Sequence, residues 1–251
     1  MIPIPAAIAA ELDTLASPAC AYLYDTRVLA ERVDQLRAAL PADSAVYYAM
    51  KANRHPRLLA RAAGACDGIE VASEGELAAA VDAGAAALLF GGPAKTDAAL
   101  NAALDCGVDC VINVESLHEL RRVDHLARRH RGVATIALRV NRAARTPEGS
   151  HRMTGVPTPF GIDETLLPQA IEAANGMDGV RLSGLHLHAV SNNLDAAEHA
   201  RFVRDGLGFA EAVSRRCGSR WDTVNVGGGL GVDYAGARRF DLDALAAGLE
   251  G

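Results

Sequence analysis

The stretch Val46-Tyr-Tyr-Ala-Met-Lys-Ala-Asn53 carries an apolar run into a single lysine. Five residues rich in β-formers precede Lys51, and Pro56 opens a helical pattern soon afterwards, so the sequence predicts a buried strand that ends in a loop at the lysine. Burial at such a strand end favours the neutral amine, which attacks carbonyl groups. The alternative is a lysine whose charged end reaches water.

The same order of strand and helix recurs throughout the chain. Apolar strands are expected at residues 46–50, 68–72, 87–90, 110–114, 135–140, 182–188 and 224–226, with helices at 56–65, 74–83, 96–106, 116–130, 163–175 and 195–216. Residue types that cap helices precede most of these helices, at Ser73, Thr96, Ser116, Asp163 and Asp195. Seven strand–helix units in a row predict an α/β fold with a parallel sheet. A (β/α)8 TIM-type barrel fits better than an open Rossmann sheet, because the unusual residues cluster at the carboxyl ends of strands.

Three segments fall outside this repeat. Residues 1–25 are expected to form a short helix and then a strand over Ala19–Tyr24, before the barrel domain at 26–251. The irregular piece Asn141–Gly161 is long enough to predict a functional loop. A helix expected over 241–250 follows the seventh strand, and the sequence offers no candidate for an eighth strand. We therefore expect an incomplete barrel whose open edge favours association.

Composition limits the classes of function. Half of the 251 residues are hydrophobic, the formal net charge is −6 and the pI is about 5.7, which argues against nucleic acid or an acidic membrane as partner and favours a small-molecule ligand. Five cysteines without a Cys-x-x-Cys pair predict reduced thiols and no metal site. The N-terminus lacks the basic region of a signal peptide, and no apolar run is long enough to span a membrane, so a cytoplasmic protein is expected.

A second cluster is the glycine-rich stretch Val224–Tyr234, which follows the seventh expected strand. Consecutive glycines allow backbone N–H groups to converge on an anion, and the loop after the seventh strand is a frequent phosphate site in eightfold barrels. A Rossmann dinucleotide site requires more chain than the 20 residues that remain after Gly231. A plain glycine turn is the other alternative.

A third cluster is Gly184–Asn193, in which strand periodicity places His186 and His188 on one face, with Ser191 just beyond. Three interpretations compete: a zinc-binding pair, two histidines satisfied in the core, and an imidazole that faces a flat aromatic cofactor. The last also uses the lysine and the glycines. An amine, a phosphate nest and a ring-facing histidine together indicate pyridoxal 5′-phosphate.

Further motifs follow in order between Ala21 and Tyr234. They are Tyr48–Asn53, Gly68–Ser73 with Gly75–Leu77, Gly92–Asp97, Ile112–Ser116, Leu138–Asn141, Phe160–Ile162, His188 with Ser191, and Val226–Tyr234. In this order they resemble the alanine-racemase-fold (fold type III) pyridoxal-phosphate-dependent decarboxylases, the group that includes diaminopimelate and ornithine decarboxylases.

That resemblance implies a fold and a set of site residues. The fold is the barrel of the alanine racemase N-terminal-domain type, which here lacks strand 8 and the C-terminal β-domain. Lys51 is then the Schiff-base lysine and His188 stacks on the pyridine ring, which makes these two the catalytic residues. The remaining cofactor-binding residues are Ser191, Gly227, Gly228 and Gly229 at the phosphate, with Glu70 and Arg139 in the polar shell of the barrel.

The departures from the family pattern concern the substrate. The family usually has His-Ile-Gly-Ser-Gln where this chain has His188-Ala-Val-Ser-Asn192, and a lysine where this chain has Pro159. Ser191–Asp195 and Met153-Thr-Gly are more similar to the siderophore-biosynthesis branch, which decarboxylates an amino-acid head group on a larger carboxylate. We expect decarboxylation of a diaminopimelate- or ornithine-type amino acid or of a siderophore precursor. The alternatives are a non-catalytic pyridoxal-phosphate carrier, an amino-acid racemase and a metal-dependent hydrolase that uses His186 and His188.

The resemblance also predicts what the 251 residues do alone. In the family, an acidic residue on the eighth strand pairs with the pyridine nitrogen, and a C-terminal β-domain completes the site across a homodimer interface. Neither has a candidate after Tyr234. We therefore expect this chain alone to bind the cofactor weakly, to associate and to lack significant decarboxylase activity.

Overall fold

A computed structural model describes residues 4–250 except 17, 19, 145, 146, 150 and 237, and all of their side chains except those of residues 151 and 152. Seven parallel strands follow one another in the central sheet, in the order β1-β2-β3-β4-β5-β8-β10. They are β1 (Tyr47–Ala49), β2 (Gly68–Val71), β3 (Ala87–Phe90), β4 (Asp109–Val114), β5 (Ala134–Asn141), β8 (Val180–His186) and β10 (Thr223–Asn225). The predicted parallel α/β repeat is confirmed, as an incomplete barrel in which no pairing of described strands joins β10 to β1.

Three shorter strands lie near the ends of the main ones. Strand β7 (Ile162–Asp163) pairs with the end of β5, and β6 (His151–Arg152) forms a separate antiparallel pair with β9 (Val190–Ser191). The long loop after β5 is therefore fastened at two places, once to the main sheet and once to the segment that follows β8.

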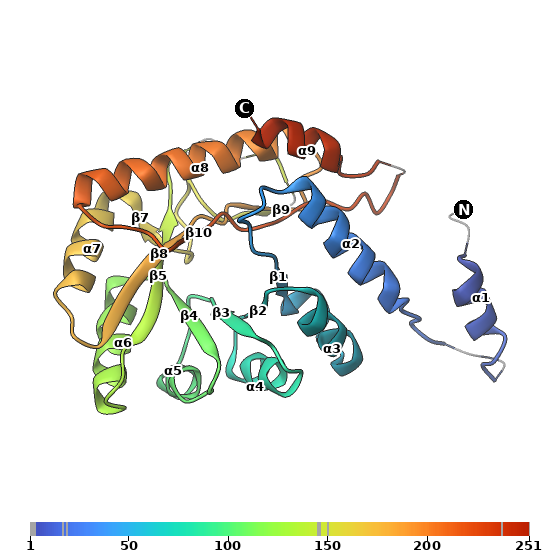
Figure 1. The fold of residues 1–251 in the computed structure, drawn as a ribbon, viewed down its shortest axis with the longest axis horizontal. Coiled ribbons are helices and arrows are strands. Elements are labelled where there is room, and N and C mark those ends of the chain that lie inside the picture. The colour runs from blue at the N-terminus through green and yellow to red at the C-terminus, as the bar shows by residue number, and fades with distance from the viewer. Residues whose placement is uncertain are drawn as a thin grey trace.

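Helices surround the sheet on its outer side (Figure 1). They are α3 (Pro56–Ala65), α4 (Glu74–Asp82), α5 (Asp97–Leu104), α6 (Leu117–Arg129), α7 (Leu167–Asn175), α8 (Ala196–Cys217) and α9 (Leu242–Leu249), with short 3-10 turns η1 (Met50–Ala52) and η2 (Glu164–Leu166). Most of the predicted caps are confirmed, because the side chains of Ser73, Thr96, Ser116 and Asp195 accept the N–H of the residue three positions on. Asp163 caps η2 in the same manner through Thr165.

The sheet has an apolar outer face and a polar inner face. Ile69, Leu88, Ile112 and Ile136 pack with the helices in the main core and are at most 2% exposed. Since side chains alternate along a strand, the positions between such residues point inward, and there the strands carry Glu70, Asn113, Arg139 and His186. Branched apolar side chains usually fill the centre of an eightfold barrel. Here the carboxyl ends of the strands surround polar groups instead.

The N-terminal segment differs from its prediction. Helix α1 (Ala6–Leu12) buries no residue and stands apart from the body in Figure 1. The strand expected over Ala19–Tyr24 is wrong for Cys20–Tyr24, which belong to no strand, and Ala19 lies outside the described residues. Tyr22 is 90% exposed. A β-rich sequence forms a strand only beside a partner strand, and the part of the chain that the structure describes offers none here.

Helix α2 (Thr26–Ala39) lies between α9 and α3, the last and first helices of the repeat. Leu36 and Leu40 pack with Phe240 and Leu245 in a second small core. The layer of helices is thus continuous at the place where β10 and β1 are not paired.

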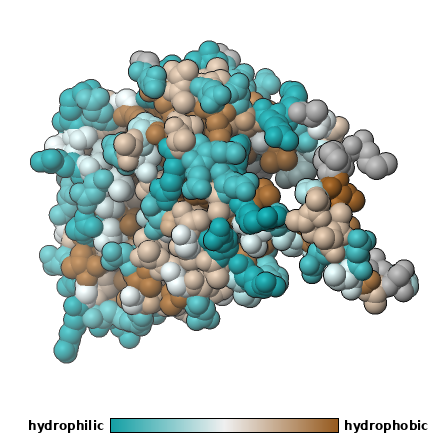
Figure 2. Space-filling model, turned by 45° about the vertical axis from the view of Figure 1, so that its right-hand side comes forward, coloured by the Kyte–Doolittle hydropathy of each residue, from teal (hydrophilic) through white to brown (hydrophobic). Residues whose placement is uncertain are grey.

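The surface is mixed in character. Figure 2 shows hydrophilic side chains over much of the visible face, with smaller hydrophobic areas between them. Within the described ranges, every helix is too short or too polar to cross a membrane.

The close approach of β8 and β10 allows a test of this packing. A Cβ atom on Gly184 would lie 1.8 Å from the carbonyl oxygen of Thr223, so Gly184→Ala must push the strands apart. We expect this variant to lower the free energy of unfolding by about 1–3 kcal/mol in chemical denaturation. Gly208→Ala is the matched control: no atom lies within 4 Å of its Cβ position in α8, and alanine favours the helix by about 1 kcal/mol. Equal effects of both substitutions would contradict the assigned packing.

Candidate functional site

Lys51 lies in η1, directly after β1, as predicted for the end of the first strand. Its side chain is exposed, so the expected burial of this lysine is wrong. The reason is local: β1 has only three residues, and the 3-10 turn that follows carries Lys51 outward while Met50 remains buried. Lys95, by contrast, is buried in an ion pair with Glu119 at 2.9 Å.

His186 and His188 lie on the same side, as strand periodicity predicts. Their ring centroids are 6.3 Å apart and the ring planes differ by 29°. His186 ends β8 and is buried. Burial, and then the positive charges of Lys51 and Arg139, lower the pKa of His188 to about 3. Burial lowers the pKa of His186 as well, so both imidazoles are neutral at physiological pH.

The ring of His188 contacts the glycine-rich loop. Gly228 donates its N–H to Nδ1 of His188 over a long 3.4 Å, which assigns the ring proton to Nε2. Nε2 is buried and has no hydrogen-bond partner among the described residues. Gly227 has a φ of +79°, and a Cβ atom there would lie 2.4 Å from Nδ1. Glycine at position 227 is therefore what allows the loop to approach the ring.

The other glycines of the loop differ in their surroundings. Gly229 has a φ of +86°, and a Cβ atom would lie 2.1 Å from the carbonyl oxygen of Val190. At Gly228 no atom lies within 4 Å of the Cβ position. Gly227 donates its N–H to Oδ1 of Asn225 at 2.8 Å, so an anion in the predicted nest would have to compete with side-chain acceptors. Ser191, in β9, adjoins Gly229, with its Cα 3.4 Å from the Cβ position.

Arg139 of β5 and Glu70 of β2 both lie on the inner face, on strands that are separated by β3 and β4. Arg139 forms a buried ion pair with Glu115 at 3.0 Å, and its guanidinium carbon lies 4.6 Å from the ring centre of Phe160. Burial raises the pKa of Glu70, against the opposing effect of Lys51 and Arg139. Lys51 and Arg139 therefore act electrostatically on both Glu70 and His188.

Two inner-face residues were not assigned a role from the sequence. Asn113 is fully buried, and neither its amide nitrogen nor its amide oxygen has a hydrogen-bond partner among the described residues. Glu115 is buried at the end of β4 and contacts Arg139. Both belong to the motif Ile112–Ser116, so the available signal was a polar residue at every second position of an otherwise apolar strand end. The described residues contain no cluster of three or more His, Cys, Asp or Glu side chains that could hold a metal ion.

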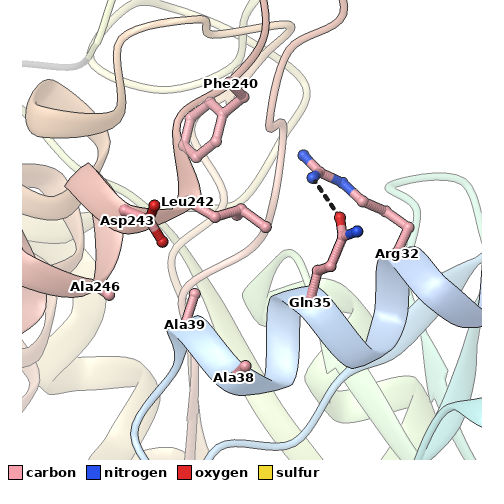
Figure 3. Close-up of a pocket in the computed structure, with 8 residues that line it drawn as sticks. All are labelled: Arg32, Gln35, Ala38, Ala39, Phe240, Leu242, Asp243 and Ala246. Carbon is pink, nitrogen blue, oxygen red and sulfur yellow. Dashed lines mark hydrogen bonds between the residues drawn. The ribbon is translucent and has the colours of Figure 1, made fainter.

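A hollow between α2 and α9 is separate from these residues (Figure 3). It has a volume of about 360 Å³ and is lined by Arg32, Gln35, Ala38, Ala39, Phe240, Leu242, Asp243 and Ala246. In Figure 3 Arg32 and Gln35 of α2 are joined by a hydrogen bond of 3.2 Å. None of the predicted site residues lines it, so we place the chemistry at the strand ends.

Comparison with known proteins identifies the family to which the chain is similar. Residues 26–249 match the family model described as pyridoxal-dependent decarboxylase, pyridoxal binding domain. A 2-[(L-alanin-3-ylcarbamoyl)methyl]-2-hydroxybutanedioate decarboxylase of Staphylococcus aureus is 38% identical over 93% of this chain and 58% of the relative. A diaminopimelate decarboxylase of Bacteroides thetaiotaomicron is 34% identical over 87% of this chain and 57% of the relative. The chain thus spans little more than half the length of these relatives.

Solved structures share the fold. The diaminopimelate decarboxylase of Helicobacter pylori, complexed with L-lysine, superposes with a TM-score of 0.85 over 96% of this chain and 61% of that chain, at 24% identity. AQ1208 from Aquifex aeolicus gives a TM-score of 0.80 over 96% of this chain and 57% of that one, at 29% identity. The incomplete barrel expected from the sequence thus matches the corresponding part of these proteins.

The buried histidines predict how stability depends on pH. Burial lowers the pKa of His199 to about 4 and that of His188 to about 3, whereas both bind a proton near pH 6.5 when the chain is unfolded. Their contribution is therefore fully present above pH 6.5 and is lost as the pH falls towards 4. We expect the free energy of unfolding to decrease over this range, with about 2–3 kcal/mol of the loss due to His199. Denaturant titrations at stepped pH values should show a smaller slope for His199→Gln, and an unchanged slope would refute this assignment.

Proposed function

We propose a function for this chain from the premise that it belongs to the pyridoxal-dependent decarboxylases and corresponds to their pyridoxal-binding domain. The chain binds pyridoxal 5′-phosphate and serves the decarboxylation of an amino acid. The observation that carries the proposal is the position of His188. Its neutral ring is held against the glycine-rich loop and within the electrostatic reach of Lys51. A flat cofactor with an aldehyde at one end and a phosphate at the other requires this combination of groups.

The residues present fit that cofactor. Lys51 is exposed at the mouth of the barrel, where its amine would hold the aldehyde carbon. His188 would lie against the ring, and its buried, unpartnered Nε2 fits a site that a polar ligand completes. Gly227, Gly228 and Gly229, with Ser191, would hold the phosphate through backbone N–H and hydroxyl donors.

The protein's own contribution is position and charge. Pyridoxal phosphate, when bound, accepts the electron pair that remains when carbon dioxide leaves an amino acid. Lys51 supplies positive charge at the strand ends, and the guanidinium of Arg139 is paired with Glu115. His188 remains neutral next to them, since its lowered pKa keeps it unprotonated in the physiological range.

For the substrate we propose an amino-acid head group on a larger carboxylate. The support is the name of the Staphylococcus aureus relative, which describes a hydroxybutanedioate that carries an L-alanin-3-ylcarbamoyl group. It agrees with Ser191–Asp195 and Met153-Thr-Gly, which resemble the siderophore branch, and with the departures at His188–Asn192 and Pro159, which argue against diaminopimelate and ornithine. We propose further that a longer form of this chain acts as a homodimer in the cytoplasm.

The two lysines of the chain give a direct test of cofactor binding. After incubation with pyridoxal phosphate and borohydride reduction, peptide mapping should find the pyridoxyl group on Lys51, because that amine is exposed. Lys95 is the internal control, since it is buried, ion-paired with Glu119 and hydrogen-bonded to the carbonyl oxygen of Asn113. Lys51→Ala should remove the label. A label confined to Lys95, or the absence of any label in the unmodified chain, would refute the proposal.

The glycine-rich loop can be tested at Gly228. The Cβ position there is free of neighbours, so Gly228→Val should fold normally while its side chain occupies the proposed phosphate site. We expect affinity for pyridoxal phosphate to fall by about tenfold or more, equivalent to about 1.4 kcal/mol, with little change for unphosphorylated pyridoxal. Titrations followed by absorbance would measure both. An equal loss for the two ligands would show that the loop is only a turn.

A further inference from the structure

The carboxylate of Glu115 is a point at which three separate segments meet. It lies directly after β4 and is 5% exposed. Oε1 accepts the N–H of Gly92 at 2.8 Å and Nη1 of Arg139 at 3.0 Å, while Oε2 accepts the N–H of Gly161 at 3.1 Å. Both oxygens are therefore used, and the charge is paired with a guanidinium.

The backbone on either side is shaped for these contacts. Gly92, just after β3, has a φ of +101°, and Gly161, just before β7, has a φ of +79°. A Cβ atom on Gly161 would lie 2.9 Å from the backbone nitrogen of Asn141. The end of the loop that follows β5 thus lies against the sheet at the point where its N–H reaches Glu115.

Arg139 is held from more than one side by the same loop. The ring of Phe160 lies 4.6 Å from its guanidinium carbon, and Nη2 is 4.0 Å from Sδ of Met153. Its positive charge acts on Glu70 and His188, where it lowers both pKa values. The position of this guanidinium therefore affects how readily Glu70 and His188 bind a proton.

Two carboxylates act on this one guanidinium, those of the buried Glu115 and the half-buried Glu70. Glu70 and Glu115 both act electrostatically with Arg139, yet the ion pair is formed with Glu115. If Arg139 bound both oxygens of Glu115, fewer acceptor sites would remain for the backbone N–H groups, but here Arg139 uses only Oε1, and Gly92 and Gly161 donate to the remaining acceptor sites. Glu70 thus remains without a close ion pair to Arg139.

We propose that Glu115 is a positioning residue: its carboxylate fixes the guanidinium of Arg139 away from Glu70 and fastens the end of the loop after β5 to the mouth of the barrel. The consequence of this inference rests on the proposed function: because Glu115 holds Arg139 and the loop in a single position, the cofactor and the substrate always encounter the same arrangement of these groups. Glu115 itself need not touch either of them.

Glu115→Gln separates these contacts with little change of shape. The amide oxygen replaces Oε1 and keeps the donors Gly92 and Arg139, whereas the NH2 group replaces Oε2 and cannot accept the N–H of Gly161. We expect hydrogen exchange at the Gly161 amide to accelerate by about tenfold or more, while the Gly92 amide remains protected. Affinity for pyridoxal phosphate should fall by about tenfold, because a neutral amide holds the guanidinium of Arg139 less firmly and the end of the loop is no longer fastened.

Glu119→Gln is the matched control. Glu119 is also buried and ion-paired, with Lys95 at 2.9 Å. Its Oε2 accepts the backbone N–H of Glu115 at 2.7 Å, a contact that the amide oxygen of glutamine can keep, and among the described residues no hydrogen bond or ion pair links its side chain to Arg139 or Gly161. It should lose comparable stability in denaturant titrations without faster exchange at Gly161 and with less than about threefold loss of affinity. If both variants behave alike, Glu115 is only a structural residue and the inference is wrong.

The two measurements, cofactor affinity and hydrogen exchange at Gly161, distinguish a failure of this inference from a failure of the proposed function. If the unmodified chain does not bind pyridoxal phosphate, the proposed function fails, while exchange at Gly161 still reports whether Glu115 holds the loop. If the unmodified chain binds and Glu115→Gln binds equally well, the inference fails alone. Should Glu115→Gln not fold, Glu115→Asp keeps the charge but shortens the side chain by one methylene, so that its carboxylate cannot reach Gly92, Arg139 and Gly161 together. It should accelerate exchange at Gly161 and lower the affinity in the same direction, and unchanged values of both would overturn the inference.

Discussion

The alternation of side chains across the parallel sheet is the constraint on which the rest of this structure depends. Because one face of each strand packs into an apolar core with the helices, the inner face carries the remaining positions, and near the strand ends these are polar. Parallel register then fixes their neighbours: Arg139 is opposite His186, and His186 is opposite Asn225. A shift of one residue in the register of any strand would turn its polar site residues toward the helices and its apolar core residues toward the inner face.

Local sequence signals were sufficient to predict the repeated strand–helix units but not the structure of the segment that precedes them or the exposure of Lys51. Each strand–helix unit has its own apolar stripe and most have their own cap, so the seven units could be predicted one by one. Cys20–Tyr24 have the composition of a strand, but a strand exists only through its pairing, and pairing is not a local property. The same reasoning applies to Lys51. Its exposure follows from the 3-10 turn that ends β1 after three residues, which the composition of the stretch does not encode.

The candidate site divides in a similar way between local and distant contacts. The glycines and His188 could be grouped because each glycine marks a close approach, and the structure shows that Gly227 approaches His188 itself. Glu115 gave no comparable signal, since a glutamate before a helix-capping serine is common at the start of a helix. Its three partners are 23, 24 and 46 residues away along the chain. Only the fold brings them together.

The distribution of charge at the strand ends follows from these contacts. Arg139 is neutralised by Glu115, Lys95 is neutralised by Glu119, and both inner histidines are kept uncharged by burial. Burial also raises the pKa of Glu70, which weakens its tendency to carry a negative charge. Among the described residues, Lys51 forms no ion pair. A ligand with a phosphate and a carboxylate would meet its positive charge at the mouth, and protonation of the histidines is not required to provide that charge.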